Sequence, residues 1–238
     1  MIKTILLDMD GTLLPVDNDT FTHTYFKLLC AKLMPYGYEA ADIVRGLRSG
    51  MKAMVKNDGT RTNREAFWDD FALTLGEKVR DMEPVCNEFY GNEFNKVKDL
   101  LGIGVDRKPL IDMLHRKGYR VVLANNPMLP PEGTNSRLSW LNLKSEDFDL
   151  VTDYSNSTYC KPNPDFYREI VHKVGCSADE CLMVGNSITD DATAAIAGLD
   201  VYIVTDALEG NADELNKYKH GSFSDFCALA EELPDVNG

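Results

Sequence analysis

Short runs of apolar residues alternate along the chain with segments of helical periodicity. The runs are too continuous for strands with one face in water, so they predict strands buried on both faces of a parallel sheet. Five such strands are expected, at residues 3–7, 120–124, 149–151, 181–184 and 201–204. Helices are expected between and after them at residues 109–117, 164–174 and 190–197. This alternation predicts an α/β fold with a doubly wound, Rossmann-like parallel sheet.

The long segment between the first two strands breaks the alternation, because its patterns are helical throughout. Its clearest helices are expected at residues 20–33, 40–56 and 63–75, the last of which follows the capping-box pair Thr62 and Glu65. We predict that residues 16–106 form a helical cap domain, inserted into a core made of residues 1–15 and 107–238.

The charge of the chain restricts its partners. There are 25 Lys and Arg residues against 38 Asp and Glu residues, a net charge of −13. A surface of this sign repels nucleic acid and anionic membranes, so we expect neither as a partner. No segment resembles a signal peptide or a membrane span of about 20 apolar residues. We therefore expect a compact cytoplasmic protein, and the sequence does not indicate its oligomeric state.

The six cysteines are scattered and contain no C-x-x-C pair, which predicts reduced thiols rather than a disulfide framework. His172, Cys176 and Cys181 could be considered as zinc ligands. We disfavour that reading because structural zinc sites use four ligands in tight pairs, and because Cys181 begins an apolar run.

Two carboxylates, Asp8 and Asp10, follow the first predicted strand directly. Adjacent carboxylates repel each other and lose solvation at the end of a buried strand, so they indicate a bound cation or a proton-transfer role. The carboxyl ends of parallel strands are also where ligands bind in open α/β sheets. A simple turn at Asp10-Gly11 would explain only one of the two aspartates.

Further polar residues follow the fourth strand, where Asn186, Asp190 and Asp191 precede an alanine-rich segment. The two aspartates could complete a Mg²⁺ site with the first pair, because Mg²⁺ prefers a few carboxylates together with water and phosphate. Capping of a helix N-terminus is the alternative role for Asp190 or Asp191. Lys161, restrained by Pro162, could bind a phosphate.

Together these motifs resemble those of the haloacid dehalogenase-like (HAD) hydrolase superfamily, and the nearest branch is the phosphoglycolate phosphatase-like one, with a helical cap after the first strand. Asp8, Asp10 and Thr12 match its D-x-D-x-T motif. The later motifs fall, in order, at Asn125 with Asn126, at Lys161, and at Gly185-Asn186 followed by Asp190 or Asp191.

The chain departs from the family pattern at two positions. Asn125 stands where Ser or Thr is typical, and its amide can still donate a hydrogen bond to a phosphoryl oxygen. Asn186 replaces an acidic residue with a neutral oxygen ligand, which should weaken Mg²⁺ binding. The spacing does not decide between Asp190 and Asp191, although the residues downstream favour Asp191 slightly.

The resemblance implies a Mg²⁺-dependent phosphatase that hydrolyses a small phosphorylated metabolite, a phosphomonoester. Asp8 would be the nucleophile that forms an aspartyl-phosphate, and Asp10 the acid and base. By the same resemblance, the metal would be held by Asp8, the Asp10 carbonyl, Asn186 and Asp191 or Asp190. Lys161 and Asn125 would hold the transferring oxygens. Thr12 and Asn126 would bind the substrate.

Two other functions stay open at this point. A HAD-like binding or scaffold protein with weak or no catalysis is the first alternative, because of Asn125 and Asn186. A sugar phosphomutase is less favoured, since it needs another acid or base in the cap and His23 is the only histidine near. Dehalogenation is disfavoured because it has no use for Asp10.

A basic stripe runs along the second predicted helix of the cap. Arg45, Arg48, Lys52 and Lys56 recur at intervals of three and four residues, which places them on one helix face. Arg48 and Lys52 are therefore candidates for contacts with an anionic substrate. The alternative is an ordinary solvated face.

Overall fold

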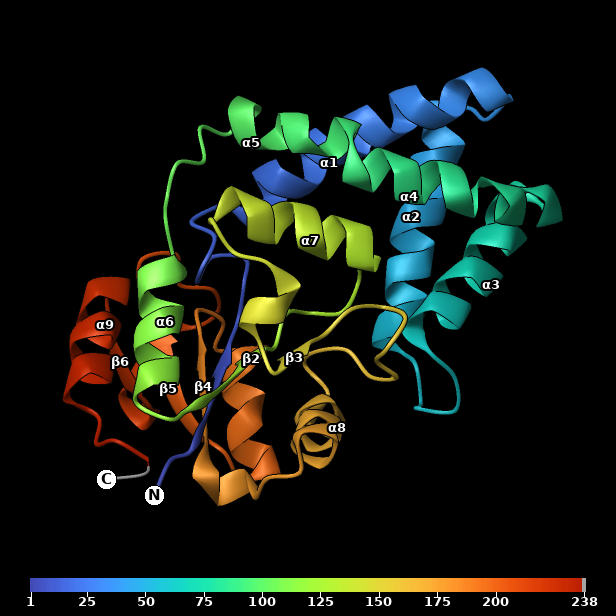
Figure 1. Cartoon of the computed structure of the whole chain (residues 1–238). Helices are drawn as coiled ribbons and strands as arrows, with labels where there is room; N and C mark the ends of the chain where they lie inside the picture. The colour runs from blue at the N-terminus through green and yellow to red at the C-terminus, as the bar shows by residue number, and fades with distance from the viewer. Residues whose placement is uncertain (237–238) are drawn as a thin grey trace.

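A parallel sheet forms the centre of the computed structural model, which describes residues 1–236 (Figure 1). Its strands are β1 (Thr4–Leu7), β2 (Arg120–Leu123), β3 (Leu150–Val151), β4 (Cys181–Gly185), β5 (Asp200–Val204) and β6 (Lys219–Gly221). Across the described residues their order in the sheet is β3-β2-β1-β4-β5-β6. The predicted α/β fold with a doubly wound parallel sheet is confirmed.

The five predicted strands are confirmed, each to within one residue at either end. The apolar pattern does not predict β6, because Lys219 and His220 are exposed and this edge strand contains no apolar run. Edge strands need only one buried side, so their sequences carry a weaker signal than those of central strands.

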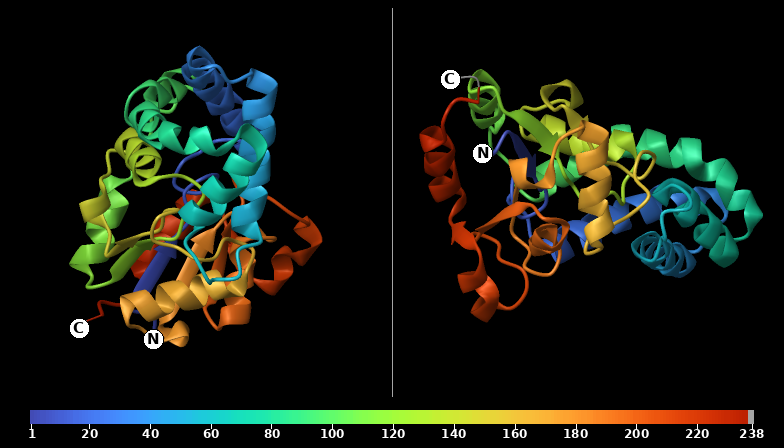
Figure 2. Two further views of the ribbon diagram at one scale, coloured as in Figure 1. Left: turned by 90° about the vertical axis from the view of Figure 1, so that its right-hand side faces the viewer. Right: turned by 90° about the horizontal axis from the view of Figure 1, so that it is seen from below.

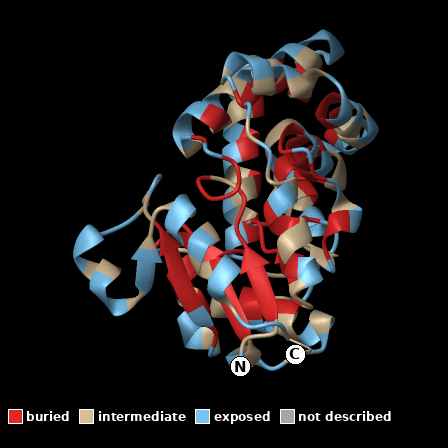
Figure 3. Ribbon diagram, turned by 60° about the vertical axis from the view of Figure 1, so that its left-hand side comes forward, coloured by how far each residue is buried: buried red, intermediate tan, exposed pale blue. Residues whose placement is uncertain are grey.

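The central strands have the buried colour in Figure 3, and alternate residues of β1 pack in different apolar clusters. Leu6 packs in the cluster that includes α8 (Pro164–Val174). Leu7 packs in the cluster that includes α6 (Lys108–Arg116) and α9 (Phe223–Glu232). Helices thus cover both faces, which explains why the strand sequences are continuously apolar.

The helix predicted at 190–197 is a 3₁₀ helix, η6 (Asp191–Ala197). The amide of Ser187 donates to the Asp191 carboxylate at 2.9 Å, and the Asp191 amide donates back to the Ser187 carbonyl at 2.8 Å. Such local side-chain bonds compete with α-helical ones and tighten the first turn.

The elements from α1 to α5, which follow β1 and precede α6, are helical and lie beyond the carboxyl ends of the strands (Figures 1 and 2). The α-helices of this segment are α1 (Asn18–Leu33), α2 (Ala40–Val55), α3 (Asn63–Leu75), α4 (Glu83–Gly91) and α5 (Lys96–Leu100). Short 3₁₀ turns connect them at Met34–Tyr36, Glu77–Met82 and Glu93–Asn95. The boundaries 16–106 for a separate cap domain stay a prediction. Within residues 1–236, no helix combines the length and apolar content that crossing a membrane requires.

One helix from the other part of the chain, α7 (Pro131–Trp140), packs against these inserted helices. The Ser136 hydroxyl donates to the Tyr90 carbonyl at 2.7 Å, and the Trp140 indole donates to Asn95 Oδ1 at 2.7 Å. The helix α7 therefore fixes the inserted helices over the carboxyl end of the sheet.

The predicted capping box at the start of α3 is confirmed, with Thr62 and Glu65 each bonding the backbone of the other. We expect Thr62→Ala to lower the free energy of unfolding by about 1 kcal/mol, because the Glu65 amide in the first turn loses the Thr62 hydroxyl that accepts its hydrogen bond. Urea unfolding followed by circular dichroism measures this. Thr60→Ala, at an exposed threonine outside any helix, is the control and should change stability by less than about 0.5 kcal/mol. Equal losses in the two variants would contradict the capping role.

Candidate active site

Most of the predicted site residues converge where the strand order reverses, at the carboxyl ends of β1 and β4. In parallel sheets this switch point leaves a crevice for ligands. A cavity of about 220 Å³ lies there. Eight of the predicted residues line it, namely Asp8, Asp10, Asn125, Asn126, Lys161, Asn186, Asp190 and Asp191.

Three predicted residues lie elsewhere. Thr12 is buried below the cavity and does not line it. Arg48 and Lys52 are exposed on α2, and neither lines the cavity. Arg48 instead lines a groove of about 920 Å³ between α1 and α2, together with the exposed His23. That groove contains none of the converging carboxylates, so we place the chemistry in the smaller cavity.

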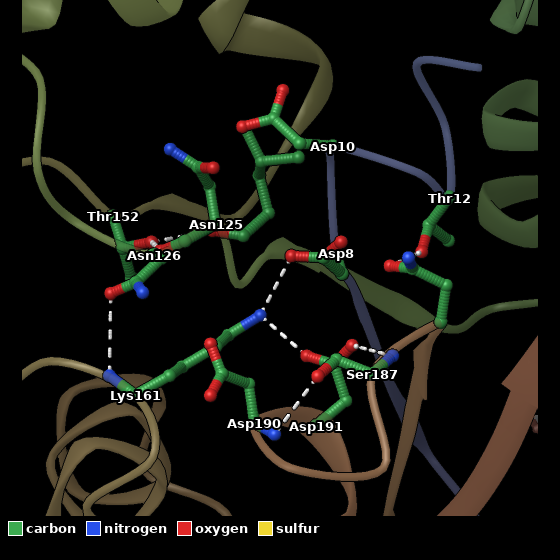
Figure 4. Close-up of polar contacts among 12 residues, drawn as sticks. Asp8, Asp10, Thr12, Asn125, Asn126, Thr152, Lys161, Ser187, Asp190 and Asp191 are labelled. Carbon is green, nitrogen blue, oxygen red and sulfur yellow. Dashed lines mark hydrogen bonds and ion pairs between the residues drawn. The ribbon is translucent and has the colours of Figure 1, made fainter. Parts of the chain in front are cut away.

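The Lys161 ammonium lies at the centre of the site (Figure 4). Its Nζ is 2.7 Å from Asp8 Oδ1 and 2.7 Å from Asp191 Oδ1, and its side chain is only 2% exposed. The Lys161 amide also donates to Asn126 Oδ1 at 3.3 Å. Lys161 thus ties the loop before α8 to the loops that follow β1, β2 and β4.

Burial and these contacts set the protonation of the cluster. Burial raises the pKa of Asp8 to about 7, against the opposing effect of the Lys161 charge, and the Asp191 charge raises it further. Burial alone would lower the pKa of Lys161, but the Asp191 and Asp8 carboxylates raise it well above its usual value. Lys161 therefore stays a cation, and Asp8 needs positive charge beside it to remain fully ionised at neutral pH.

The structure distinguishes the two neighbouring aspartates that the spacing leaves open. Asp191 bonds Lys161 through Oδ1 and the Ser187 amide through Oδ2, so its carboxylate faces Asp8. A Cβ at Gly185 would lie 2.2 Å from that carboxylate, so only glycine fits there. Asp190 lines the cavity wall without an ion pair to Lys161, and burial raises its pKa.

Asn186 links two loops beneath the cavity. Its Oδ1 accepts from the Thr12 hydroxyl at 3.2 Å, and its Nδ2 donates to the Ala207 carbonyl at 2.6 Å. Gly11, with φ near 80°, lets the backbone approach so closely that a Cβ there would lie 2.3 Å from Asn186 Nδ2. Both polar ends of the Asn186 amide are thus engaged by the protein.

Asn125 is the opposite case. Its backbone carbonyl accepts from the Thr152 hydroxyl at 2.6 Å, which fixes the loop after β2. Its Nδ2 is buried and has no hydrogen-bond partner among the described residues. A buried unpaired donor is costly, so this amide beside the cavity is suited to an acceptor oxygen on a ligand.

Two charged residues that line the cavity are not predicted from the sequence. Arg137, on α7, donates from Nη1 to Asp10 Oδ2 at 2.6 Å. Glu209, after β5, accepts from Asn18 Nδ2 at 2.6 Å. Neither belongs to a recognisable motif, and the polar sequence before Arg137 gives no signal that singles it out.

Comparison with protein families decides the class of this site. Residues 2–198 match the family described as haloacid dehalogenase-like hydrolase. The chain belongs to this hydrolase family. The predicted family resemblance and the predicted class of enzyme are therefore confirmed.

Curated relatives of this HAD hydrolase are phosphatases. It is 22% identical over 240 residues to the pyrophosphatase PpaX of Bacillus cereus, covering 99% of this chain and 98% of the relative. It is 34% identical over 97 residues to the phosphoglycolate phosphatase of Rhodospirillum rubrum, covering 40% of this chain and 39% of the relative.

Solved structures share the fold. CbbY from Rhodobacter sphaeroides, in complex with phosphate, matches with a TM-score of 0.63 at 18% identity, over 98% of this chain and all of that one. A HAD phosphatase from Thermococcus onnurineus matches with a TM-score of 0.60 at 16% identity, over 99% of this chain and 100% of that one. A 2-haloacid dehalogenase from Pseudomonas syringae matches with a TM-score of 0.61 at 18% identity, over 98% of this chain and 100% of that one. The fold alone therefore does not choose between phosphatase and dehalogenase.

The donors of this HAD hydrolase fit a hard divalent cation that keeps several waters. Asp8 and Asp191 bring carboxylate oxygens to one ammonium, and phosphatases of this family generally use a divalent metal. In the described part of the chain no cluster of three or more His, Cys, Asp and Glu side chains is arranged to hold a metal. A Mg²⁺ site that also binds phosphate nevertheless usually takes only one or two carboxylate ligands from the protein.

The raised pKa of Asp8 predicts how stability depends on pH when no metal is present. The folded state binds this proton more tightly than the unfolded chain, whose pKa is 3.8, so the stabilisation is full below about pH 4 and is lost as pH rises to about 7. With EDTA present, wild-type stability should fall more between about pH 5 and about pH 8 than that of Asp8→Asn. Urea unfolding at the two pH values tests this, and parallel losses would contradict it.

Proposed function

We propose that the protein is a Mg²⁺-dependent phosphatase that hydrolyses small phosphomonoesters through an aspartyl-phosphate on Asp8. The observation that carries this proposal is the cluster in one cavity of Asp8, Lys161 and Asp191 with the unpaired amide of Asn125. The cluster combines a nucleophile with donors for phosphoryl oxygens, which is what phosphoryl transfer requires.

Each residue has a defined part in this proposal. Asp8 Oδ2 makes no hydrogen bond within residues 1–236, so we assign it as the oxygen that attacks phosphorus, while Lys161 orients the carboxylate through Oδ1. Lys161 and Asn125 Nδ2 donate to the transferring oxygens. Asp10, at the cavity wall, gives a proton to the departing oxygen and then takes one from the attacking water.

The metal would be held by Asp8, Asp191 and the Asp10 carbonyl. When bound, Mg²⁺ supplies positive charge between the carboxylates and the phosphate, which an acidic cavity with a single nearby ammonium needs. Because Asn186 is engaged by Thr12 and Ala207, we assign it the role of supporting the loop rather than a leading role in metal binding.

The names of the curated relatives suggest pyrophosphate and phosphoglycolate as compounds to test. A phosphomutase is not favoured, because His23 is exposed and lines the groove between α1 and α2 but not the cavity that contains the carboxylates. Contacts of Arg48 and Lys52 with a substrate stay a prediction, and so does the cytoplasmic location.

Replacement of the nucleophile tests the proposal. Phosphate release from p-nitrophenyl phosphate should require Mg²⁺ and should fall at least about 10³-fold in Asp8→Asn, because an amide cannot form the covalent intermediate. A scaffold protein would give no Mg²⁺-dependent release in the wild type. Unchanged turnover in Asp8→Asn would refute the assignment of the nucleophile.

The neighbouring aspartates provide a matched pair for the metal. Asp191→Asn should raise the Mg²⁺ concentration needed for half-maximal activity at least about tenfold, because it removes a carboxylate beside Asp8. Asp190→Asn is the control, one residue away, and should leave that concentration within about threefold of wild type. A larger rise in that concentration for Asp190→Asn than for Asp191→Asn would instead assign Asp190 as the metal ligand. Mg²⁺ titration of phosphate release measures both.

A further inference from the structure

Arg137 is a buried cation whose hydrogen bonds are incomplete. The side chain is 2% exposed and makes one ion pair, from Nη1 to Asp10 Oδ2. Its Nε and Nη2 have no hydrogen-bond partner among the described residues. A guanidinium carries five N–H donors, and leaving them unpaired inside a protein is costly. The position therefore has donors available for a ligand.

Other unpaired polar atoms surround the same cavity. Asp10 Oδ1 and Asn125 Nδ2 are also buried without a partner in the described structure, and both residues line the cavity with Arg137. The Asn125 amide and two nitrogens of Arg137 are donors, whereas only the Asp10 oxygen is an acceptor. A ligand that satisfies this set must present several acceptor oxygens, which is the chemistry of an anion.

The charges around the cavity single out Arg137. The acidic residues that line the cavity are Asp8, Asp10, Asp190, Asp191 and Glu209. Within the described chain, the basic residues that line the cavity are Lys161 and Arg137. Lys161 is already shared by two carboxylates, whereas Arg137 contacts one. Of the two cations, Arg137 thus has the greater capacity for a further anion.

Residues of α1 complete the surroundings. The ring centroid of Phe21 lies 5.9 Å from the Arg137 guanidinium carbon, which restrains its plane. Tyr25 lines the same cavity, and burial raises the pKa of its phenol, so it stays a neutral donor. These side chains enclose the end of the cavity where Asp10 lies.

We propose that Arg137 binds a second anionic group on the departing part of the substrate. This inference rests on the proposed function, in which Asp10 protonates the departing oxygen, because Arg137 bonds Asp10 directly and so lies on the leaving-group side. The cavity of about 220 Å³ has room for a small leaving group beside the phosphoryl group. The preferred substrates are therefore compact phosphate compounds whose departing part carries a carboxylate or a second phosphoryl group.

Two nearly isosteric esters test this proposal. 2-Phosphoglycolate carries a carboxylate where 2-hydroxyethyl phosphate carries a neutral CH₂OH group. The wild type should prefer phosphoglycolate by about 10- to 150-fold in kcat/KM, the factor expected for a charge-assisted hydrogen bond. In Arg137→Gln the preference should fall to about threefold or less. Pyrophosphate, assayed in parallel, shows whether a phosphoryl group can replace the carboxylate.

Control variants separate binding from other roles of Arg137. Arg116→Gln, at an exposed arginine on α6, should keep the wild-type preference. Arg137→Lys keeps the charge without the planar fork and should retain part of the preference. If Arg137 only positions Asp10, kcat for both esters will fall by the same factor and the preference will persist, which overturns the proposal.

The wild type alone can also decide the matter if Arg137→Gln does not fold. Hydrolysis of both esters with equal kcat/KM would overturn the role of Arg137 while leaving the phosphatase proposal intact. Release of phosphate from none of these compounds, nor from p-nitrophenyl phosphate, would contradict the phosphatase proposal and this inference with it.

Discussion

The pairing of one buried ammonium with two buried carboxylates is the constraint on which the site depends. Lys161 lies 2.7 Å from both Asp8 and Asp191. Without that cation the two carboxylates would repel each other in a cavity that water barely reaches, and Asp8 would take up a proton. Removal of one member of such a buried cluster leaves an uncompensated charge, so its parts are interdependent.

The fold supplies this arrangement through its strand order. In the described sheet, β2 and β3 lie on one side of β1, and β4 to β6 lie on the other, so the loops after β1 and β4 meet at the switch point. The loop before α8 brings Lys161 between them. The inserted helices then cover the site, and α7 connects both parts by contributing Arg137 to the cavity and Ser136 to the contact with α4.

The central part of this account can be predicted from the sequence for a physical reason. Strands buried on both faces must be continuously apolar, and a polar motif at the end of such a strand must lie at the ligand-binding edge. Asp8, Asp10, Asn125 and Lys161 therefore indicate the cavity before any coordinates are known. The capping box at Thr62 is equally local and equally predictable.

Features that depend on distant packing could not be predicted in this way. The spacing leaves Asp190 and Asp191 equivalent, and only the 3₁₀ turn at η6 directs Asp191 towards Lys161. Arg137 faces Asp10 across 127 positions of sequence, a contact that follows from the placement of α7 and from no motif. The segment of α7 also lacks a clear apolar periodicity, so its sequence does not reveal the helix that carries this arginine.

The most direct test of the central claim is to look for the covalent intermediate itself. The enzyme is mixed with a phosphomonoester and Mg²⁺ and quenched in acid, and any acyl phosphate is reduced with borohydride before peptide mass spectrometry. The account predicts that Asp8 alone is converted to homoserine, in a substrate-dependent manner. Steady release of phosphate with the label on another residue, or with no label on any residue, would contradict it.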